Sequence, residues 1–179
     1  MNKEQFINEL KKININISVE TIEKLEKYYQ ILVEENKKYN LTAITEENQV
    51  YLKHFYDSLC IVKIFDPKDQ YILDIGTGAG FPGLVLKIVY PKLRIDLLDS
   101  TNKKCLFLKK VIEKLDLANI NVINARAEEY SKKVREKLDA EGFSDCSIVA
   151  SNSLDEFIIR DLLDQGACIN SFGVGERLI

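Results

Sequence analysis

The sequence predicts an α/β protein in which a mostly parallel sheet follows an N-terminal helical segment. Three observations support this fold class. Apolar residues in the first part of the chain recur at intervals of three and four, the period of amphipathic helices. From residue 71 onward, short apolar runs alternate with helical patterns, which is typical of βαβ units and a parallel sheet. A cluster of glycines lies where the first of these strands meets its helix.

Length, composition and charge exclude several classes of protein. The 179 residues, 46% hydrophobic and 30% charged, suit a folded domain with a small extension and not a disordered chain. The net charge of -3 excludes a strongly basic nucleic-acid-coating protein, although residues 67–130 carry 10 Lys and Arg against 8 Asp and Glu. No secretory signal and no apolar run of about 18 residues occurs, so we expect a cytoplasmic protein without a membrane span.

Cysteine usage points to reduced thiols and to no bound metal. The four cysteines form no CxxC pair, and the single histidine does not complete a Cys/His zinc set. We expect Cys60, Cys105, Cys146 and Cys168 to pack as small apolar side chains.

The segment 1–66 is predicted to be helical. Its apolar period runs through two helices, and the stretch 18–21 is expected to cap the second, with Thr21 giving the first turn an acceptor. The stretch 40–43 interrupts the period, which resumes over 46–65. Pro67 lies in a turn-like stretch, so we place a domain boundary there.

The domain 67–179 is predicted to alternate strands with helices. Strands are expected at 71–75, 94–99, 119–123, 147–150 and 168–172. Helices are expected between them at 82–89, 103–115, 131–138 and 154–163.

The strongest chemical signal is the stretch 74–83, which reads DIGTGAGFPG at the end of the first strand. Glycines let the backbone turn sharply and let a ligand approach main-chain N–H groups. The spacing is Gly-x-Gly-x-Gly, whereas dinucleotide-binding loops read Gly-x-Gly-x-x-Gly. The acid Asp74 would repel a phosphate but can accept hydrogen bonds from an ammonium or a hydroxyl group. S-adenosylmethionine fits this chemistry, and the alternative is a tight turn without a ligand.

Two further strand ends complete the expected site. Asp99 ends the second strand, where an acid typically holds ribose hydroxyls, and the alternative is a solvated loop acid. The stretch 124–129 follows the third strand at the same edge of the sheet and would face an adenine. Glu128 and Glu129 could equally be first-turn acids favoured by the helix dipole.

Basic and aromatic residues allow two readings each. A helix near the loop carries five lysines that could neutralise phosphates of a nucleic acid or could form a solvated face: Lys103, Lys104, Lys109, Lys110 and Lys114. His54 lies beside Phe55 and Tyr56, and we expect a packing residue there, with a general base as the alternative.

These residues resemble the ribosomal small-subunit methyltransferase G family, also called glucose-inhibited division protein B. The matching pieces follow the family's order within residues 1 to about 137, and they are 40–43, 54–59, 74–83, 97–100, 103–108 and 126–129. The resemblance implies a Rossmann-like class I methyltransferase sheet behind an N-terminal helical segment. It also implies methyl transfer from S-adenosylmethionine to N7 of a guanine in 16S ribosomal RNA.

The resemblance adds contacts to the expected site. It implies that Gly76, Phe81, Ala127 and Glu128 contact the cofactor. With the residues singled out above, the expected cofactor-binding set is Asp74, Gly76, Thr77, Gly78, Gly80, Phe81, Asp99, Ala127 and Glu128. No catalytic residue is assigned.

From about residue 138 the sequence departs from this family. Where the family places an arginine after its fourth strand, residues 149–153 read VASNS. The segment 138–179 instead resembles a strand–helix–strand fragment of nicotinate phosphoribosyltransferase, through 148–156, 165–167 and 172–178. We therefore interpret the chain as a chimera, in which a barrel-derived βαβ unit of the same handedness replaces the original one.

Three functions stay open at this point. The first is an S-adenosylmethionine-binding methyltransferase-type domain whose transfer to 16S ribosomal RNA is impaired, because part of the substrate-positioning surface is missing. The second is a non-catalytic chimeric protein that retains a fold without activity. The third is phosphate binding at the backbone of 173–175.

Overall fold

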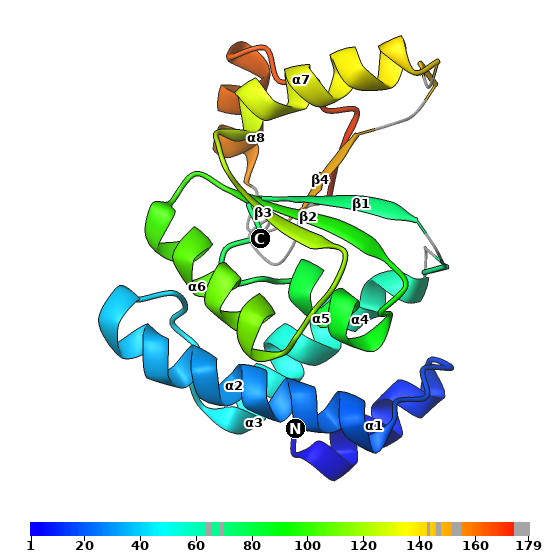
Figure 1. Cartoon of the computed structure of the whole chain (residues 1–179), viewed down its shortest axis with the longest axis vertical. Coiled ribbons are helices and arrows are strands. Elements are labelled where there is room, and N and C mark those ends of the chain that lie inside the picture. Colours follow the sequence, from blue (N-terminus) through cyan, green and yellow to red (C-terminus); the bar gives the residue numbers. More distant parts are fainter. Residues whose placement is uncertain (64–65, 69, 143, 146–147, 152–154, 174–179) are drawn as a thin grey trace.

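The computed structural model describes residues 1–63, 66–68, 70–142, 144–145, 148–151 and 155–173. Helices come first, and strands then alternate with helices (Figure 1). The helical elements are α1 (Lys3–Lys12), α2 (Val19–Tyr39), α3 (Glu47–Val50), η1 (Tyr51–Tyr56), α4 (Asp57–Leu59), η2 (Cys60–Lys63), α5 (Gly83–Val89), α6 (Asn102–Lys114), α7 (Ala127–Ala140) and α8 (Glu156–Asp164). The strands are β1 (Tyr71–Ile75), β2 (Arg94–Asp99), β3 (Ile120–Asn124), β4 (Val149–Ser151) and β5 (Ser171–Gly173).

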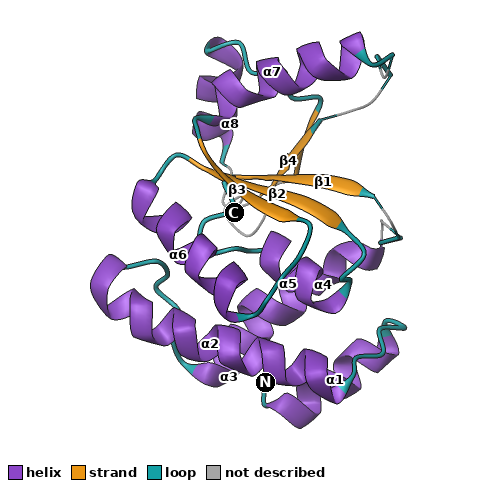
Figure 2. Ribbon diagram, viewed as in Figure 1, coloured by secondary structure: helices purple, strands orange, loops and turns teal. Residues whose placement is uncertain are grey.

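The strands form parallel ladders, which confirms the predicted α/β class. β1 pairs with β2 and β2 pairs with β3, so that Asp74 lies opposite Leu97 and Asp99 lies opposite Asn124. β4 and β5 form a second parallel pair, and β4 lies beside β1 (Figures 1 and 2). Because β1, β2 and β3 run in one direction, the loops that follow them meet at one edge of the sheet.

One face of the sheet carries the larger core. Helices α5 and α6 lie on this face, and α1–α4 pack beneath them (Figure 2); we call α1–α6 with η1 and η2 the first layer. Ile95 and Leu97 of β2 are buried in this core together with Tyr28 and Phe55 of the N-terminal segment. A single hydrophobic core therefore joins residues on both sides of the boundary predicted at Pro67.

Helices α7 and α8 cover the opposite face, and we call them the second layer (Figure 1). Its core is smaller and consists of Ile75, Leu98, Ile148, Ala150 and Ile169. No side chain of α8 is fully buried, and Phe157 is 71% exposed. Along the part of the chain that the structure describes, no helix is long and apolar enough to cross a bilayer.

The N-terminal segment corrects one local prediction and confirms another. The acceptor that caps α2 is Ser18 Oγ and not Thr21, because Ser18 has extended backbone and its Oγ accepts from the Thr21 N–H at 3.1 Å. The helical pattern expected over 46–65 is confirmed over 47–63, where α3, the π-helical segment η1, α4 and η2 follow one another without a break. Residues 64–65 of that pattern lie outside the described residues.

The second layer corrects two boundaries. Helix α7 begins at Ala127 and not at 131, so that Glu128 and Glu129 lie in the first turn, where the helix dipole favours acids. Strand β5 begins at Ser171 and not at Cys168, whose N–H donates to Ser131 Oγ of α7 at 3.0 Å. Residue 147 of the predicted fourth strand lies outside the described residues.

Candidate functional site

The loop between β1 and α5, residues 76–82, turns sharply over the end of β2; we call it the glycine loop. The N–H groups of Gly76 and Thr77 both donate to the Leu98 carbonyl, at 2.8 and 3.0 Å. Gly76, Gly78 and Gly80 all have positive φ, which glycine adopts at little cost. The run of glycines is therefore explained by the backbone path that β2 imposes on the loop.

The glycines of this stretch differ in what surrounds them. A Cβ added to Gly83 would lie 2.3 Å from Leu97 Cδ2, and one added to Gly80 would lie 2.4 Å from Leu84 Cδ1. Among the described residues, no atom lies within 4 Å of a Cβ added to Gly76. Gly80 and Gly83 are thus required by close packing, whereas no described side chain fills the space beside Gly76.

Asp74 lies behind the glycine loop and is 5% exposed. Its Oδ2 accepts from the Gly83 N–H at 2.9 Å, which joins the strand end to the start of α5. Neither Asp74 Oδ1 nor the buried Thr77 Oγ1 has a hydrogen-bond partner of regular geometry within the described parts. Burial raises the pKa of Asp74 to about 6, against the opposing effects of the Thr77 hydroxyl and the Gly83 N–H.

Asp99 is the acid that holds the glycine loop from the side of β2. It is 5% exposed, so the alternative of a solvated loop acid was wrong. Its Oδ2 accepts from the Gly78 N–H at 3.0 Å and lies 3.5 Å from Lys104 Nζ, and its Oδ1 accepts from the Thr101 N–H at 2.8 Å. This carboxylate joins the loops after β1 and β2 at the edge where a ribose is expected.

The loop after β3 reaches the same edge through Asn124. The Asn124 side chain donates to the Asp99 carbonyl at 3.2 Å, so the second and third strand ends are joined. Glu128 is buried in the first turn of α7 and pairs with Arg126. The structure thus shows the helix-acid role for Glu128, and contact of Ala127 and Glu128 with an adenine stays a prediction.

An aromatic cluster from the N-terminal segment supports the glycine loop. His54 stacks on Phe81 with ring centroids 4.3 Å apart and an angle of 11°, and its Nε2 lies 3.0 Å from Thr42 Oγ1. Burial lowers the pKa of His54. These contacts are those of the packing residue that we expected. The Tyr28 hydroxyl donates to the Ala79 carbonyl, a contact across 51 residues that no local pattern indicates.

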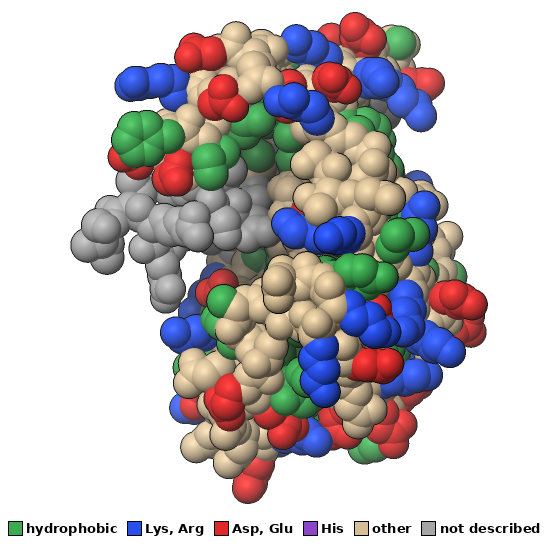
Figure 3. Space-filling view, turned by 90° about the vertical axis from the view of Figure 1, so that its left-hand side faces the viewer, with side chains coloured by type: hydrophobic (Ala, Val, Ile, Leu, Met, Phe, Trp, Pro, Cys, Tyr) green, Lys and Arg blue, Asp and Glu red, His purple; other side chains and the backbone are tan. Residues whose placement is uncertain are grey.

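The lysines of α6 divide into two groups. Lys104 lies near Asp99, and Lys110 pairs with the buried Glu35 at 2.8 Å. The other three are exposed: Lys103, Lys109 and Lys114. Acidic and basic side chains alternate over the molecular face in Figure 3, which shows no surface of a single sign.

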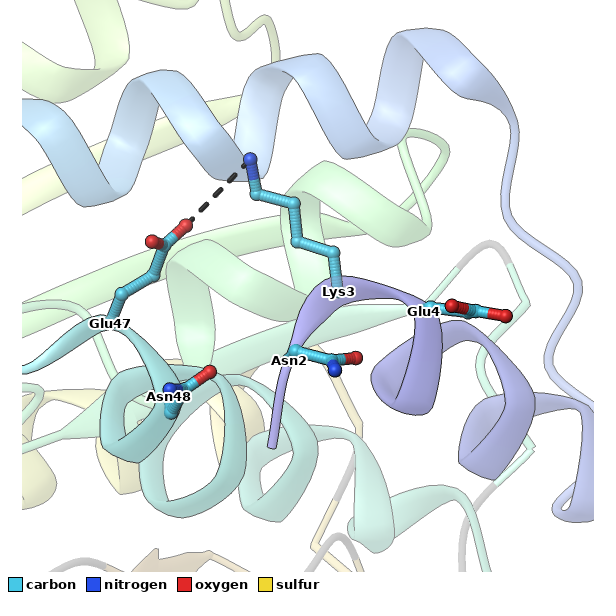
Figure 4. A pocket seen from close by; sticks show the side chains of 5 residues that line it. All are labelled: Asn2, Lys3, Glu4, Glu47 and Asn48. Carbon is cyan, nitrogen blue, oxygen red and sulfur yellow. Dashed lines mark ion pairs between the residues drawn. The ribbon is translucent and has the colours of Figure 1, made fainter.

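A surface hollow beside the N-terminus is explained by helix capping (Figure 4). The Asn2 side chain caps α1, and Lys3 Nζ lies 3.7 Å from Glu47 Oε1. The terminal amine donates to the Asn48 carbonyl at 2.9 Å. These contacts attach α1 to α3, far from the edge at which the strands end.

The remaining predictions on metals, thiols and phosphate have limited structural coverage. The described ranges contain no cluster of three His, Cys, Asp or Glu side chains that could hold a metal ion. Cys60, Cys105 and Cys168 are free thiols, and Cys146 lies outside the described residues. Residues 174–175 of the predicted phosphate site and residues 152–153 of the stretch 149–153 also lie outside them.

Comparisons with known proteins agree on one family. The family model described as rRNA small subunit methyltransferase G matches residues 21–157. A "Ribosomal RNA small subunit methyltransferase G" of Mycoplasma mycoides is 55% identical over 119 residues, which are 66% of this chain and 87% of that protein. The protein of the same name from Mycoplasma capricolum is also 55% identical over 119 residues, but these make up 52% of its length.

A more distant relative covers nearly the whole chain. The protein of that name from Lactococcus lactis subsp. lactis is 38% identical over 172 residues, which are 95% of this chain and 72% of that protein. This match includes most of the segment after residue 137, for which we expected a second parent. Because one family covers both sides of the expected join, the comparisons give no support to a chimera or to a nicotinate phosphoribosyltransferase segment.

Proposed function

The chain belongs to the rRNA small subunit methyltransferase G family, and on that premise we propose that it transfers a methyl group from S-adenosylmethionine to N7 of a guanine in 16S ribosomal RNA. The observation that carries the proposal is the edge where the glycine loop, Asp99 and Asn124 meet. Gly76 borders open space there, and Asp99 lies at the end of the neighbouring strand.

The residues at this edge fit S-adenosylmethionine better than a dinucleotide. Asp74 lies near the end of β1 beneath the glycine loop, where a carboxylate would repel a pyrophosphate, and Asp99 ends β2, where an acid suits ribose hydroxyls. A sulfonium, an ammonium and ribose hydroxyls suit such acids, because carboxylates accept hydrogen bonds from hydroxyls and attract cations. We assign the cofactor to Gly76, Thr77, Gly78 and Asp99, with Ala127 and Glu128 at the adenine end. Asp74, Gly80 and Phe81 hold the loop from behind.

The chemistry asks little of the protein beyond positioning. When bound, the cofactor supplies a methyl group on a positively charged sulfur. The lone pair of guanine N7 forms the new bond to this methyl group, the electrons of the S–CH3 bond stay on sulfur, and S-adenosylhomocysteine leaves, so no proton needs to leave. A general base is therefore not required, and His54 is already engaged by Phe81 and Thr42. What the chain must provide is a fixed loop and an orientation of the guanine in line with the transferred group.

RNA phosphates have candidate partners on α6, whose N-terminus follows Asp99. Lys103 is exposed in the first turn of this helix, next to the edge, and Lys109 and Lys114 are exposed farther along it. The mixed charge over the face in Figure 3 favours a local contact and not a broad basic surface. A substrate of this kind agrees with the cytoplasmic location that we expected.

We expected weakened transfer from the departure after residue 138, but nothing in the comparisons supports impairment. The protein is therefore proposed to be an active enzyme and not a non-catalytic one. The chain spans about half to seven-eighths of the length of the two Mycoplasma relatives.

A methylation assay tests the proposal. The protein is incubated with unmethylated 16S ribosomal RNA, or small subunits, and radiolabelled S-adenosylmethionine. Borohydride reduction followed by aniline cleavage then detects N7-methylguanine by chain scission. We expect label in RNA and a single cleavage site. Label without aniline-sensitive scission would contradict N7 as the acceptor, and absence of label with subunits and naked RNA would contradict the proposed activity.

A further inference from the structure

Tyr28 connects the N-terminal segment to the glycine loop. It lies in α2, is fully buried, and its hydroxyl donates to the Ala79 carbonyl. Its ring stacks on Phe55 with centroids 5.6 Å apart and lies 5.7 Å from the ring of Phe81. The rings of Phe55 and Phe81 thus fix the position of the Tyr28 hydroxyl beneath the loop.

The Ala79 carbonyl occupies the centre of the glycine loop. On one side the Gly78 N–H donates to Asp99, and on the other the Gly80 N–H donates to the Thr77 carbonyl at 2.8 Å. A Cβ at Gly80 would lie 2.8 Å from the Tyr28 oxygen, so α2 and the glycine loop are in direct contact at this point. Rotation of the Ala79–Gly80 peptide would break the Tyr28 contact and would turn the Gly80 N–H away from its acceptor.

We propose that Tyr28 is a positioning residue for the cofactor: its hydroxyl fixes the Ala79–Gly80 peptide and so presents the Gly76–Gly78 part of the glycine loop to S-adenosylmethionine. The proposal rests on the proposed function for the identity of the ligand. It makes the N-terminal helical segment a support of the cofactor site, although none of the residues assigned to the cofactor above lies in that segment.

Tyr51 offers a matched control within the same cluster. It is also fully buried, and its ring packs edge-on against Phe55 with centroids 5.1 Å apart. Its hydroxyl has no hydrogen-bond partner within the described parts of the chain. Tyr51→Phe therefore removes an equally buried hydroxyl that holds no loop, whereas Tyr28→Phe leaves the Ala79 carbonyl without its donor.

Calorimetric titration with S-adenosylmethionine and S-adenosylhomocysteine compares the two variants. Loss of a buried hydrogen bond to the loop is expected to weaken binding by roughly tenfold in Tyr28→Phe. Tyr51→Phe is expected to bind like the wild type. In the methylation assay Tyr28→Phe should raise KM for S-adenosylmethionine while kcat and KM for RNA stay unchanged. Equal affinities in all three proteins would overturn the proposal.

Amide hydrogen exchange without ligand separates this proposal from the proposed function. Faster exchange confined to Gly80 and Phe81 in Tyr28→Phe, but not in Tyr51→Phe, is expected if Tyr28 holds the loop. Exchange that rises equally throughout the first layer would indicate general destabilisation and would overturn the positioning role. If the wild type binds no cofactor but Tyr28→Phe still exchanges faster at Gly80 and Phe81, the proposed ligand is wrong and the loop-holding role stands.

Discussion

The two layers of helices on the sheet differ in how completely they bury their side chains. In the first layer, aromatic and aliphatic side chains of α2, η1 and α5 are fully buried, among them Tyr28, Phe55 and Leu84. In the second layer α8 has no fully buried side chain, and Leu163 is 49% exposed. The glycine loop rests on the first layer, whereas Ala127 and Glu128 begin the second. The proposed cofactor site therefore has one firmly held side and one weakly held side.

The largest expected effect compares a leucine from the core on each face of the sheet. Leu97→Ala opens a cavity in a fully buried position next to Gly83 and is expected to lower the free energy of unfolding by about 4 kcal/mol. Leu162→Ala, in the half-buried face of α8, is expected to cost about 1 kcal/mol. Urea denaturation followed by circular dichroism measures both values. Equal losses would contradict the difference between the layers.

A smaller effect concerns Asp74, the buried acid of β1. Burial raises the pKa of Asp74 from an ordinary value of 3.8 to about 6 in the folded protein. Because the folded state then binds the proton more tightly than the unfolded chain, the stability contributed by this group is greatest below pH 4 and is lost as pH rises toward 6. The loss is about 2 to 3 kcal/mol by pH 7.

Asp74→Asn should remove this dependence, because an amide oxygen can still accept from the Gly83 N–H. Urea unfolding of wild type and variant at pH 4.5 and pH 7.5 provides the test. The wild type is expected to lose more stability between the two pH values than the variant loses. A parallel change in both proteins would show that Asp74 titrates as an exposed acid does.

The smallest effect compares the helix caps of the two layers. Ser18 Oγ accepts from the Thr21 N–H at 3.1 Å, and Asp155 Oδ1 accepts from the Ile158 N–H at 2.8 Å. Each change to Ala is expected to cost about 1 kcal/mol where the helix is coupled to global unfolding. We expect Ser18→Ala to lower the urea midpoint and Asp155→Ala to speed amide exchange in α8 alone. A lowered global midpoint in Asp155→Ala would show that α8 is as firmly coupled as α2.

The elements that the sequence predicts well are those with a local signal. The strand at 71–75 and the glycine-rich turn after it lie where the sequence predicts them, because a short apolar run and glycine spacing are recognised within a few residues. The start of α7 was placed late, although Glu128 and Glu129 are acids typical of a first helical turn. The same acids also fit an adenine contact, so they do not by themselves fix where the helix begins.

Contacts between residues far apart in the sequence leave no local pattern from which they could be predicted. Tyr28 reads as one more apolar position on a helix, and its hydrogen bond to Ala79 depends on how α2 docks against the sheet. The burial of Asp99 likewise depends on the loops that fold over it. The resemblance to the family implies a site at the glycine loop, but it does not indicate which residues hold the loop.

Amide chemical shifts during titration with S-adenosylhomocysteine locate the site in a single experiment. We expect saturable shifts at Gly76, Thr77, Gly78 and at the ends of β2 and β3, with smaller and broader changes at Ala127 and Glu128. Gly76→Ala should weaken the affinity measured from these shifts by roughly tenfold, since its methyl group enters the space proposed for the ligand. Gly142→Ala is the control, because it also has positive φ and open surroundings but lies beyond α7. Shifts confined to the hollow at Asn2 and Asn48, or equal weakening by both variants, would contradict a cofactor site at the glycine loop.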